Sequence, residues 1–334
     1  MTTIIAEAGV NHNGDPALAV RLVDVAADAG ADCVKFQTFR ADKLAVEAAP
    51  KAAYQAAATG ASESQLAMLR KLELPKEAWT DIAARCAERG IEFLSTPFDE
   101  DSAAFLDTLG VRRFKVPSGE LTNLAFLARL ARYGKPVLLS TGMADLEEVR
   151  LAVQALEDAG AGEVTVLHCV TDYPADPADA NLRAMATMRQ AFGTPVGWSD
   201  HMPGNEVAFA AAALGASVIE KHFTLDRTLP GPDHAASMEP AELAALVAGV
   251  RKIERALGDG EKIPTARELA NRAVVRRSLV AAIDIPRGAA ITEAMIAARR
   301  PGDGLPPAML PQLVGRRAMR DIRAGTLLSR EMLA

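Results

Sequence analysis

The chain has 334 residues and a formal net charge of −6, a length that suits one large domain or a large domain with a small one. Apolar residues make up 49% of it and charged residues 24%, so an ordinary globular core is expected, and the acidic balance argues against a basic nucleic-acid-binding surface. No apolar run approaches the roughly 18–20 residues of a membrane span, so we expect no membrane association.

The N-terminus and the cysteines both favour a cytoplasmic protein. The first seven residues have no basic region and include Glu7, unlike a signal peptide. The cysteines, Cys33, Cys86 and Cys169, are scattered and form no CxxC pair. This spacing argues against a disulfide scaffold or a structural zinc cluster and fits a reducing compartment.

One pattern repeats through about 255 residues: a short apolar run ends in polar residues, a helical stretch follows, and a glycine ends the helix. In the first unit the run at 4–6 ends at Glu7, Asp15 and Pro16 are typical of a helix N-terminus, and Gly30 of its end. Later apolar runs lie at 33–37, 93–96, 114–116, 137–140, 164–168, 195–199 and 218–222.

These alternating units predict an α/β protein with a (β/α)8 TIM barrel. A doubly wound open sheet is the alternative, but it usually has fewer strands, and no GxGxxG motif follows the first run. The stretch from Arg40 to Glu73 is too long for a simple connection, so we expect an inserted loop over the barrel mouth.

After Gly258 the pattern stops, and we expect a barrel domain over 1–260, a linker over 261–273 and a small domain over 274–334. The last segment carries a charge of about +5, which leaves about −11 for the rest of the chain. It also contains a repeat, because the features around Asp284 recur about 37 residues later around Asp321. Two strand–turn–strand–helix copies predict a compact, β-rich module with pseudo-twofold symmetry.

Reactive groups in such barrels lie at the carboxyl ends of the strands. All five histidines fall at these ends or in the loops that follow: His12, His168, His201, His222 and His234. His201 and His222 follow adjacent strands and are the predicted metal ligands, with positions left for substrate and water around Mn²⁺, Zn²⁺ or Fe²⁺. The alternative is that they are ordinary hydrogen-bonding residues.

Lysines and hydroxyl groups at the same ends predict an anion site for a ligand with phosphate and carboxylate groups. Its candidate residues are Lys35, Lys115, Ser95, Thr96, Ser118, Ser140 and Ser199. Lys115, flanked by apolar neighbours, has Schiff-base chemistry as an alternative. Glu7 and Glu120 are candidate acid/base groups, or else structural partners of the two lysines.

Motifs along nearly the whole chain resemble those of the sialic acid synthases. They are IAEAGVNHNG at 5–14, VKFQ at 34–37, STPF at 95–98, KVPSGE at 115–120, LSTGM at 139–143, WSDH at 198–201, EKHF at 220–223 and GPD at 231–233. The segment from Val274, including RRPGDG at 299–304, resembles the SAF (antifreeze-like, β-clip) domain that ends members of this family.

The resemblance implies condensation of phosphoenolpyruvate with an N-acetylated mannose-type aldose and water, giving a nine-carbon 2-keto acid and phosphate by C–O cleavage. His201 and His222 match the family's metal ligands, usually for Mn²⁺, with Mg²⁺ or Co²⁺ as alternatives. Glu7 matches its acid/base residue, with Glu120 as a second candidate and also a sugar contact. Phosphoenolpyruvate contacts match Lys35, Thr96, Lys115, Ser118, Ser140 and Ser199, and sugar contacts match Tyr173 and Asp233.

Residues 52–55, 64–74 and 220–227 are most similar to the legionaminic acid synthases, which favours 2,4-diacetamido-2,4,6-trideoxymannose over N-acetylmannosamine. The family also implies a domain-swapped homodimer in which Arg300 reaches the sugar's N-acetyl group in the partner's barrel. There are three alternative hypotheses. They are a metal-dependent aldolase or sugar-acid synthase without phosphoenolpyruvate, a non-catalytic carbohydrate-binding factor of spore coats or surface polysaccharides, and an ice-binding C-terminal end.

Overall fold

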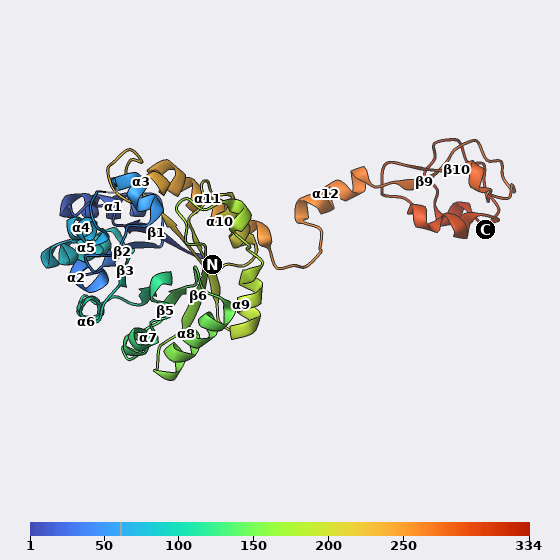
Figure 1. Cartoon of the computed structure of the whole chain (residues 1–334). Helices are drawn as coiled ribbons and strands as arrows, with labels where there is room; N and C mark the ends of the chain where they lie inside the picture. Colours follow the sequence, from blue (N-terminus) through green and yellow to red (C-terminus); the bar gives the residue numbers. More distant parts are fainter. Residues whose placement is uncertain (61) are drawn as a thin grey trace. The chain divides into compact units, whose positions relative to one another are not determined.

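The computed structural model describes residues 1–60 and 62–334 and divides into two compact units, Met1–Gly258 and Asp259–Ala334. In the described part of the first unit, eight parallel strands form one sheet (Figure 1). They are β1 (Thr3–Gly9), β2 (Cys33–Thr38), β3 (Glu92–Pro97), β4 (Phe114–Val116), β5 (Val137–Ser140), β6 (Val164–Cys169), β7 (Val196–Asp200) and β8 (Val218–His222). The hydrogen-bonded order is β3-β2-β1-β8-β7-β6-β5-β4, and β3 lies against β4. The predicted barrel is therefore confirmed.

Helices alternate with these strands and surround the barrel. They are α1 (Pro16–Asp28), α5 (Lys76–Arg89), α6 (Glu100–Thr108), α7 (Leu124–Ala131), α8 (Leu146–Asp158), α9 (Ala184–Phe192), α10 (Glu206–Ala213) and α11 (Pro240–Leu257). The predicted start of α1 is confirmed, because Asp15 accepts a hydrogen bond from the Ala17 amide at 2.8 Å and Pro16 opens the helix. Gly90 ends α5 in the left-handed region, with φ of 68°, where a side chain would be strained.

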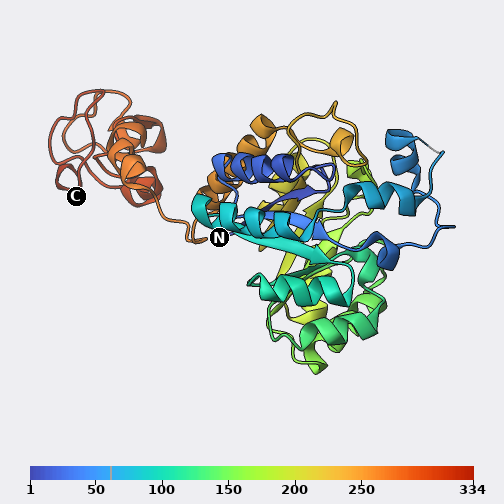
Figure 2. The same ribbon diagram turned by 90° about the vertical axis from the view of Figure 1, so that its left-hand side faces the viewer.

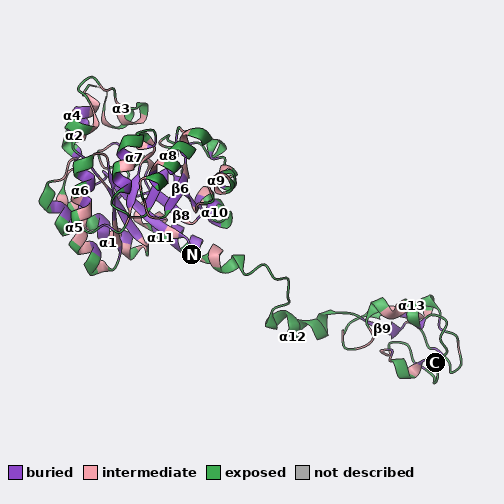
Figure 3. Cartoon of the chain, turned by 90° about the horizontal axis from the view of Figure 1, so that it is seen from below, coloured by how far each residue is buried: buried purple, intermediate pink, exposed green. Residues whose placement is uncertain are grey.

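Alternate residues of each strand point to opposite sides of the barrel wall. Outward residues such as Phe36 and Trp198 pack against the helices, which is why the strands are buried along their length (Figure 3). Inward residues form a separate apolar layer that fills the barrel: Ile5, Cys33, Leu94, Leu138, Leu167 and Val218. Gly197 belongs to this level, where a Cβ would lie 2.6 Å from Leu167 Cδ2. This layer closes the barrel below the positions that carry the polar groups.

The inserted segment between β2 and α5 contains α2 (Ala41–Leu44), α3 (Ala53–Thr59) and α4 (Gln65–Leu72) (Figure 2). Met68 and Leu72 of α4 pack with Val10 and Phe39 in a small apolar cluster. Val10 follows β1 and Phe39 follows β2, so this cluster joins the insertion to the carboxyl ends of the strands. The expected location over the barrel mouth follows from these contacts.

The second unit has its own small core, which includes Leu279, Ile285 and Ile322. It contains α12 (Ala266–Val275), β9 (Ser278–Ala281), β10 (Ile296–Arg299) and α13 (Leu310–Leu313). Most of the expected linker is therefore helical, in α12. All ten residues of α12 are described, and none of them is buried (Figure 3).

The predicted repeat has a structural counterpart in the second unit. Ile285 and Ile322 exchange backbone hydrogen bonds of 2.8 and 2.9 Å. The Asp284 carboxylate accepts from the Ala324 amide, and the Asp321 carboxylate accepts from the Arg287 amide, both at 2.7 Å. The copies differ from the expectation in two ways. Their helices are single 3₁₀ turns, η4 (Glu293–Met295) and η6 (Arg330–Met332), and among the described residues the second copy pairs through isolated bridges, such as Ala318 with Leu333, where strands were expected.

Two further observations concern the whole described chain. Its helices include none with both the length and the apolar character needed to cross a bilayer. Cys33, Cys86 and Cys169 are free thiols, and all three are buried.

Candidate active site

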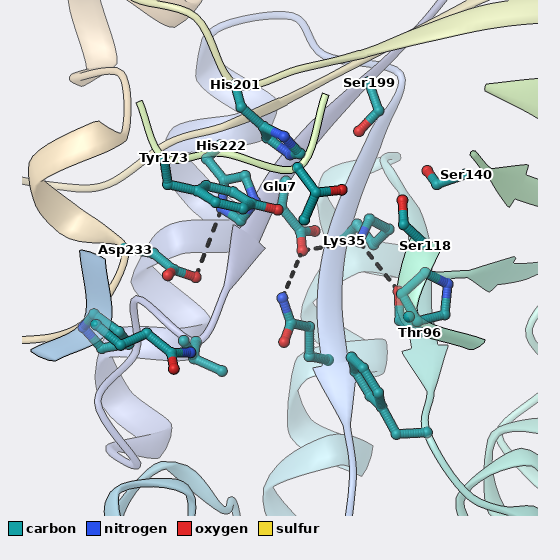
Figure 4. Close-up of a pocket in the computed structure, with 18 of the residues that line it drawn as sticks. Glu7, Lys35, Thr96, Ser118, Ser140, Tyr173, Ser199, His201, His222 and Asp233 are labelled. Carbon is teal, nitrogen blue, oxygen red and sulfur yellow. Dashed lines mark hydrogen bonds and ion pairs between the residues drawn. The ribbon is translucent and has the colours of Figure 1, made fainter. Parts of the chain in front are cut away.

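A cavity of about 290 Å³ opens at the carboxyl ends of the barrel strands. Most of its strand-borne residues stand two positions beyond the apolar interior layer, so they point inward as well. The strand residues that line it are Glu7, Lys35, Gln37, Thr96, Lys115, Ser140, Cys169, Ser199, Glu220 and His222. Figure 4 shows how the side chains it labels converge on this space.

Strand register makes Glu7 and Lys35 a buried ion pair. Glu7 is aligned with Lys35 on β2 and with His222 on β8. Lys35 Nζ lies 2.8 Å from Glu7 Oε1, and Gln37 Nε2 donates to the same oxygen at 3.2 Å. Glu7 Oε2 is buried without a hydrogen-bond partner. Burial raises the pKa of Glu7 to about 7, with Lys35 opposing the shift, so this carboxyl can exchange a proton near neutral pH.

Glu220 lies between the two buried lysines. Its Oε1 is 3.4 Å from Lys115 Nζ, its Oε2 is 3.8 Å from Lys35 Nζ, and Ser199 Oγ donates to Oε1 at 3.1 Å. Burial favours a higher pKa for Glu220, but Lys115 and Lys35 outweigh it and lower the pKa. Burial lowers the pKa of Lys115, whereas Glu220 and Glu7 overcome burial and raise that of Lys35. Lys35 is therefore the more firmly held cation.

Three hydroxyl groups beside these lysines are arranged to donate hydrogen bonds. Thr96 Oγ1 accepts from Lys35 Nζ at 3.1 Å, and Ser118 Oγ accepts from the Gly142 amide at 2.9 Å. Each hydroxyl proton is therefore left for another acceptor. Ser140 Oγ is buried without a partner. Hydroxyl donors next to buried ammonium groups suit an anionic ligand.

The two candidate metal ligands lie side by side above this cluster, with ring centroids 5.5 Å apart. His201 Nδ1 lies 2.7 Å from the Val170 carbonyl oxygen. Because a carbonyl only accepts, Nδ1 carries a hydrogen, and Nε2 has the lone pair when the ring is neutral. Burial alone would lower the pKa of His201, but Cys169 outweighs it and raises the pKa. His222 Nδ1 is buried without a hydrogen-bond partner. Burial and His201 hold the pKa of His222 well below its ordinary value, so its ring is neutral.

These imidazoles fit the chemistry of a divalent transition metal, which binds the neutral ring through a lone pair. Among the described residues, no group of three or more His, Cys, Asp or Glu is arranged to hold a metal ion. The pair therefore offers two nitrogen ligands at most from this set, and other ligands would have to come from substrate or water.

Aromatic rings and one carboxylate form the wall beside the histidines. Tyr173 packs against His201, with centroids 4.1 Å apart, and against Tyr54 of the inserted segment, 4.8 Å away. Asp233 Oδ2 lies 3.9 Å from His222 Nδ1 (Figure 4). Burial raises the pKa of Asp233 to about 6, with His201 and Lys35 opposing the shift. This part of the cavity combines a flat apolar surface with a hydrogen-bonding group.

A family model described as the NeuB family matches residues 22–262. The chain belongs to the NeuB family. A model of the SAF domain matches residues 276–334. An N,N'-diacetyllegionaminic acid synthase of Campylobacter jejuni is 46% identical over 98% of both chains. One of Legionella pneumophila is 47% identical over 97% of this chain and 92% of that protein.

A solved structure with a related sequence is also similar to this NeuB-family chain. The crystal structure of an N-acetylneuraminic acid synthetase from Leptospira borgpetersenii is similar, with a TM-score of 0.70 and 36% sequence identity. The match covers 81% of this chain and 90% of that chain.

Several candidate residues of this NeuB-family protein lie outside the cavity lining. The Glu120 carboxylate accepts a hydrogen bond from Asn123 at 2.8 Å, beside the 3₁₀ helix η1 (Ser118–Glu120). Arg300 belongs to the second unit, where its exposed side chain donates to the Val275 carbonyl at 3.0 Å. Ser95 points to the opposite side of β3 and bonds to Thr38 at 2.8 Å.

The five histidines do lie at strand ends or in the following loops, but only His201 and His222 line the cavity. His168 faces outward against Trp198, with centroids 5.1 Å apart. His12 and His234 are buried in the loops after β1 and β8.

Sequence reasoning assigned no role in the site to Glu220, Gln37, Tyr54 and Cys169, which also line the cavity. For two of them alternation along a strand was an available signal. Glu220 stands two residues before His222 and Gln37 two residues after Lys35, so each shares the inward direction. Tyr54 had no such signal, because it lies in the inserted segment.

The intervening residues of β7 and β8 make a different contact. Asp200 and Lys221 are aligned across the two strands and form a buried ion pair of 2.7 Å. Lys221 Nζ also donates to the Met202 carbonyl at 2.5 Å, and the Met202 amide donates to Asp200 Oδ1 at 3.0 Å. This network ties the ends of the strands that precede His201 and carry His222.

Proposed function

We propose that this NeuB-family chain condenses phosphoenolpyruvate with an N-acetylated mannose-type aldose, and that 2,4-diacetamido-2,4,6-trideoxymannose is its sugar. The observation that carries the proposal is one cavity in which two buried lysines and three hydroxyl donors lie next to a pair of buried histidines. The relatives named as N,N'-diacetyllegionaminic acid synthases support the choice of sugar. Neither relative supports a non-catalytic carbohydrate-binding factor.

Lys35 and Lys115 bind the phosphate and carboxylate groups of phosphoenolpyruvate in this proposal, with Thr96, Ser118 and Ser140 as hydroxyl donors. The burial of both lysines, Thr96 and Ser140 strengthens their charge-assisted hydrogen bonds, because little water competes for the anion. Ser199 orients Glu220 through the bond at 3.1 Å. Glu220 in turn favours the charged form of both ammonium groups.

Glu7 is the proton-transfer residue. Its Oε1 is held by Lys35 and Gln37, which leaves the unpartnered Oε2 as the atom that exchanges a proton with water. Overall, C3 of phosphoenolpyruvate bonds to the aldehyde carbon, and the aldehyde oxygen gains a proton. Water adds at C2 and loses one proton, which balances the proton gained by the aldehyde oxygen. The resulting C2 hydroxyl then gives its remaining proton to phosphate as the C2 carbonyl forms and the C2–O bond to phosphate breaks.

His201 and His222 would hold the divalent metal, with Mn²⁺ as the favoured ion and Mg²⁺ or Co²⁺ as alternatives. A bound metal would supply Lewis-acid polarisation of the sugar's carbonyl oxygen. The hydrogen bond from His201 Nδ1 to Val170 presets which ring nitrogen faces the cavity. Tyr173 and Asp233 then contact the sugar, and Glu120 is a further candidate for this contact.

The decisive experiment measures phosphate release with phosphoenolpyruvate, Mn²⁺ and each of the two aminosugars. Phosphoenolpyruvate labelled with ¹⁸O at the bridging oxygen distinguishes the route, because C–O cleavage leaves the label in phosphate. We expect labelled phosphate and a nine-carbon 2-keto acid, with the higher kcat/KM for the diacetamido sugar. Phosphate release without sugar, or a 2-keto acid formed without phosphoenolpyruvate, would contradict the proposal.

A test of the metal ligands uses binding as well as turnover. Calorimetry should show one Mn²⁺ site that is lost in His201→Ala and His222→Ala, and chelation should stop turnover. His168→Ala is the matched control, because His168 lies outside the cavity lining. Unchanged turnover after exhaustive chelation would contradict the assignment.

The proposal includes a domain-swapped homodimer in which Arg300 contacts the N-acetyl group bound in the partner's barrel. It is supported by the opposite charges of the two segments, about +5 and −11. Mixing inactive Glu7→Gln with inactive Arg300→Ala chains should restore activity, because one mixed site then has both residues. No recovery despite proven subunit exchange would contradict it. The expected cytoplasmic location stays a prediction.

A further inference from the structure

The motif Asn11-His12-Asn13-Gly14 follows β1 but has no part in the proposed chemistry. Asn11 and His12 are buried, and Asn13 adopts a positive φ of 53°. Its side chains reach the loop after β8, which carries Asp233. The two loops are more than 200 residues apart in sequence, so their contact is purely tertiary.

A two-step hydrogen-bond chain joins Asn11 to the backbone of Asp233. Asn11 Nδ2 donates to the Phe223 carbonyl at 2.8 Å and to Ser237 Oγ at 3.0 Å. Ser237 Oγ donates its one proton to the Asp233 carbonyl oxygen at 2.6 Å. Asn11 and Ser237 are both buried, so water does not replace these bonds readily.

A second contact holds the same loop. The His234 ring bridges Thr224 Oγ1, at 2.6 Å from Nδ1, and Asn13 Oδ1, at 3.2 Å from Nε2. Gly231 has a φ of 151° and packs directly on this bridge. A Cβ there would lie 2.6 Å from the His234 ring and 2.7 Å from Asn13 Oδ1. Asp233 is therefore fixed between the glycine and the histidine.

We infer that Asn11 and Ser237, supported by the Asn13–His234 bridge, are positioning residues that hold the Asp233 carboxylate against His222 and Tyr173 for sugar binding. The inference rests on the proposed function, in which Asp233 contacts the sugar. Asp233 lines the cavity and lies 3.9 Å from His222 (Figure 4). Asn11 and Ser237 do not line the cavity. These two residues therefore act on sugar binding only through the loop.

The test is a double-mutant cycle of Ser237→Ala and Asp233→Ala, assayed with Mn²⁺ and with both N-acetylmannosamine and the diacetamido sugar. KM and kcat are measured for each substrate, and calorimetry measures sugar binding directly. Ser237→Ala should raise the KM for sugar about five- to tenfold, as expected for one buried hydrogen bond, and change the KM for phosphoenolpyruvate less than twofold. In the Asp233→Ala background, Ser237→Ala should raise the KM for sugar by less than a further twofold. Ser237→Thr, which keeps the hydroxyl, should restore most of the loss.

Ser217→Ala is the matched control. Ser217 Oγ also donates to a carbonyl, that of Val196 at 3.1 Å, but it precedes β8 at the opposite end of that strand. This variant should leave both KM values within twofold of the wild type. If Ser237→Ala does not fold, Asn11→Ala interrupts the same series of hydrogen bonds at its other end.

The outcomes separate the inference from the function on which it rests. An Asp233→Ala variant with unchanged sugar binding would overturn the sugar contact, and the positioning role with it. Asp233→Ala could weaken sugar binding while Ser237→Ala raises the KM for sugar equally in the wild type and in the Asp233→Ala variant. That result would overturn only the positioning role. Equal rises in both KM values with a lower melting temperature would mean a merely structural hydrogen bond and would also overturn it.

Discussion

Glu220 and Lys221 are neighbours on β8, and both are charged and buried, but their surroundings differ. Glu220 points into the cavity, where its Oε2 has no hydrogen-bond partner and its nearest cations are 3.4 and 3.8 Å away. Lys221 points away from the cavity, and its ammonium group contacts the Asp200 carboxylate and the Met202 carbonyl.

The difference separates two uses of buried charge. A fully partnered pair offsets part of its desolvation cost and holds two strand ends together. A loosely partnered group keeps free hydrogen-bonding capacity for a ligand. Nine buried side-chain polar atoms in the described residues have no partner, and four belong to the cavity lining: those of Glu7, Ser140, Glu220 and His222. The following variants test this distinction.

The largest effect is expected for Glu7→Gln on the cavity side. Glutamine keeps a similar shape but cannot accept and return a proton at Oε2, so kcat should fall about 10²–10⁴-fold. Calorimetry should still show binding of phosphoenolpyruvate, because the lysines and hydroxyls are intact. Wild-type turnover in this variant would mean that Glu7 is only a structural partner of Lys35.

On the opposite side, Lys221→Met should mainly reduce stability. It leaves the buried Asp200 carboxylate without its cation, and the free energy of unfolding should fall by about 3–5 kcal/mol. Urea denaturation measures the loss. The double variant Asp200→Asn with Lys221→Met should recover a large part of it, because no buried charge remains unpaired. An unchanged unfolding midpoint for Lys221→Met would contradict the distinction between the two faces of β8.

A smaller effect concerns a buried group that is neutral rather than charged. Burial lowers the pKa of His12 from 6.5 to about 4. Between these values the unfolded chain binds a proton that the folded chain does not, so stability should be complete above pH 6.5 and fall towards pH 4, by about 1–3 kcal/mol from this residue. His12→Asn offers an oxygen in place of Nδ1 to the Gly14 amide and should flatten the urea-midpoint profile in this window. An identical profile in the variant would contradict the assignment.

The smallest effects are expected at the exposed carboxylates of the second unit. Asp284 and Asp321 cap equivalent turns of the repeat with bonds of the same length. Asp284→Ala and Asp321→Ala should each cost about 0.5–1.5 kcal/mol, seen as faster hydrogen exchange at the amides of Ala324 and Arg287, respectively. Unequal losses would mean that the repeat is not symmetric in energy, and each variant serves as the control for the other.

Much of the barrel could be predicted from local signals. The apolar runs marked the strands, and Asp15 with Pro16 marked the start of α1, because caps and alternation depend on neighbours in sequence. The polar ends of the runs also located Glu7, Lys35 and His222 at one end of the barrel. The single 3₁₀ turns of the second unit were not predicted, since short helices depend more on packing than on propensity.

The sequence by itself therefore determined the order of the elements and the end of the barrel at which the polar residues lie, because periodicity and caps are local properties. Which of those residues touch was decided only by the tertiary structure. Parallel register aligned Glu7 with Lys35 and His222. Contacts between loops more than 200 residues apart set Asp233 in place through Asn11, and no local preference carries that information.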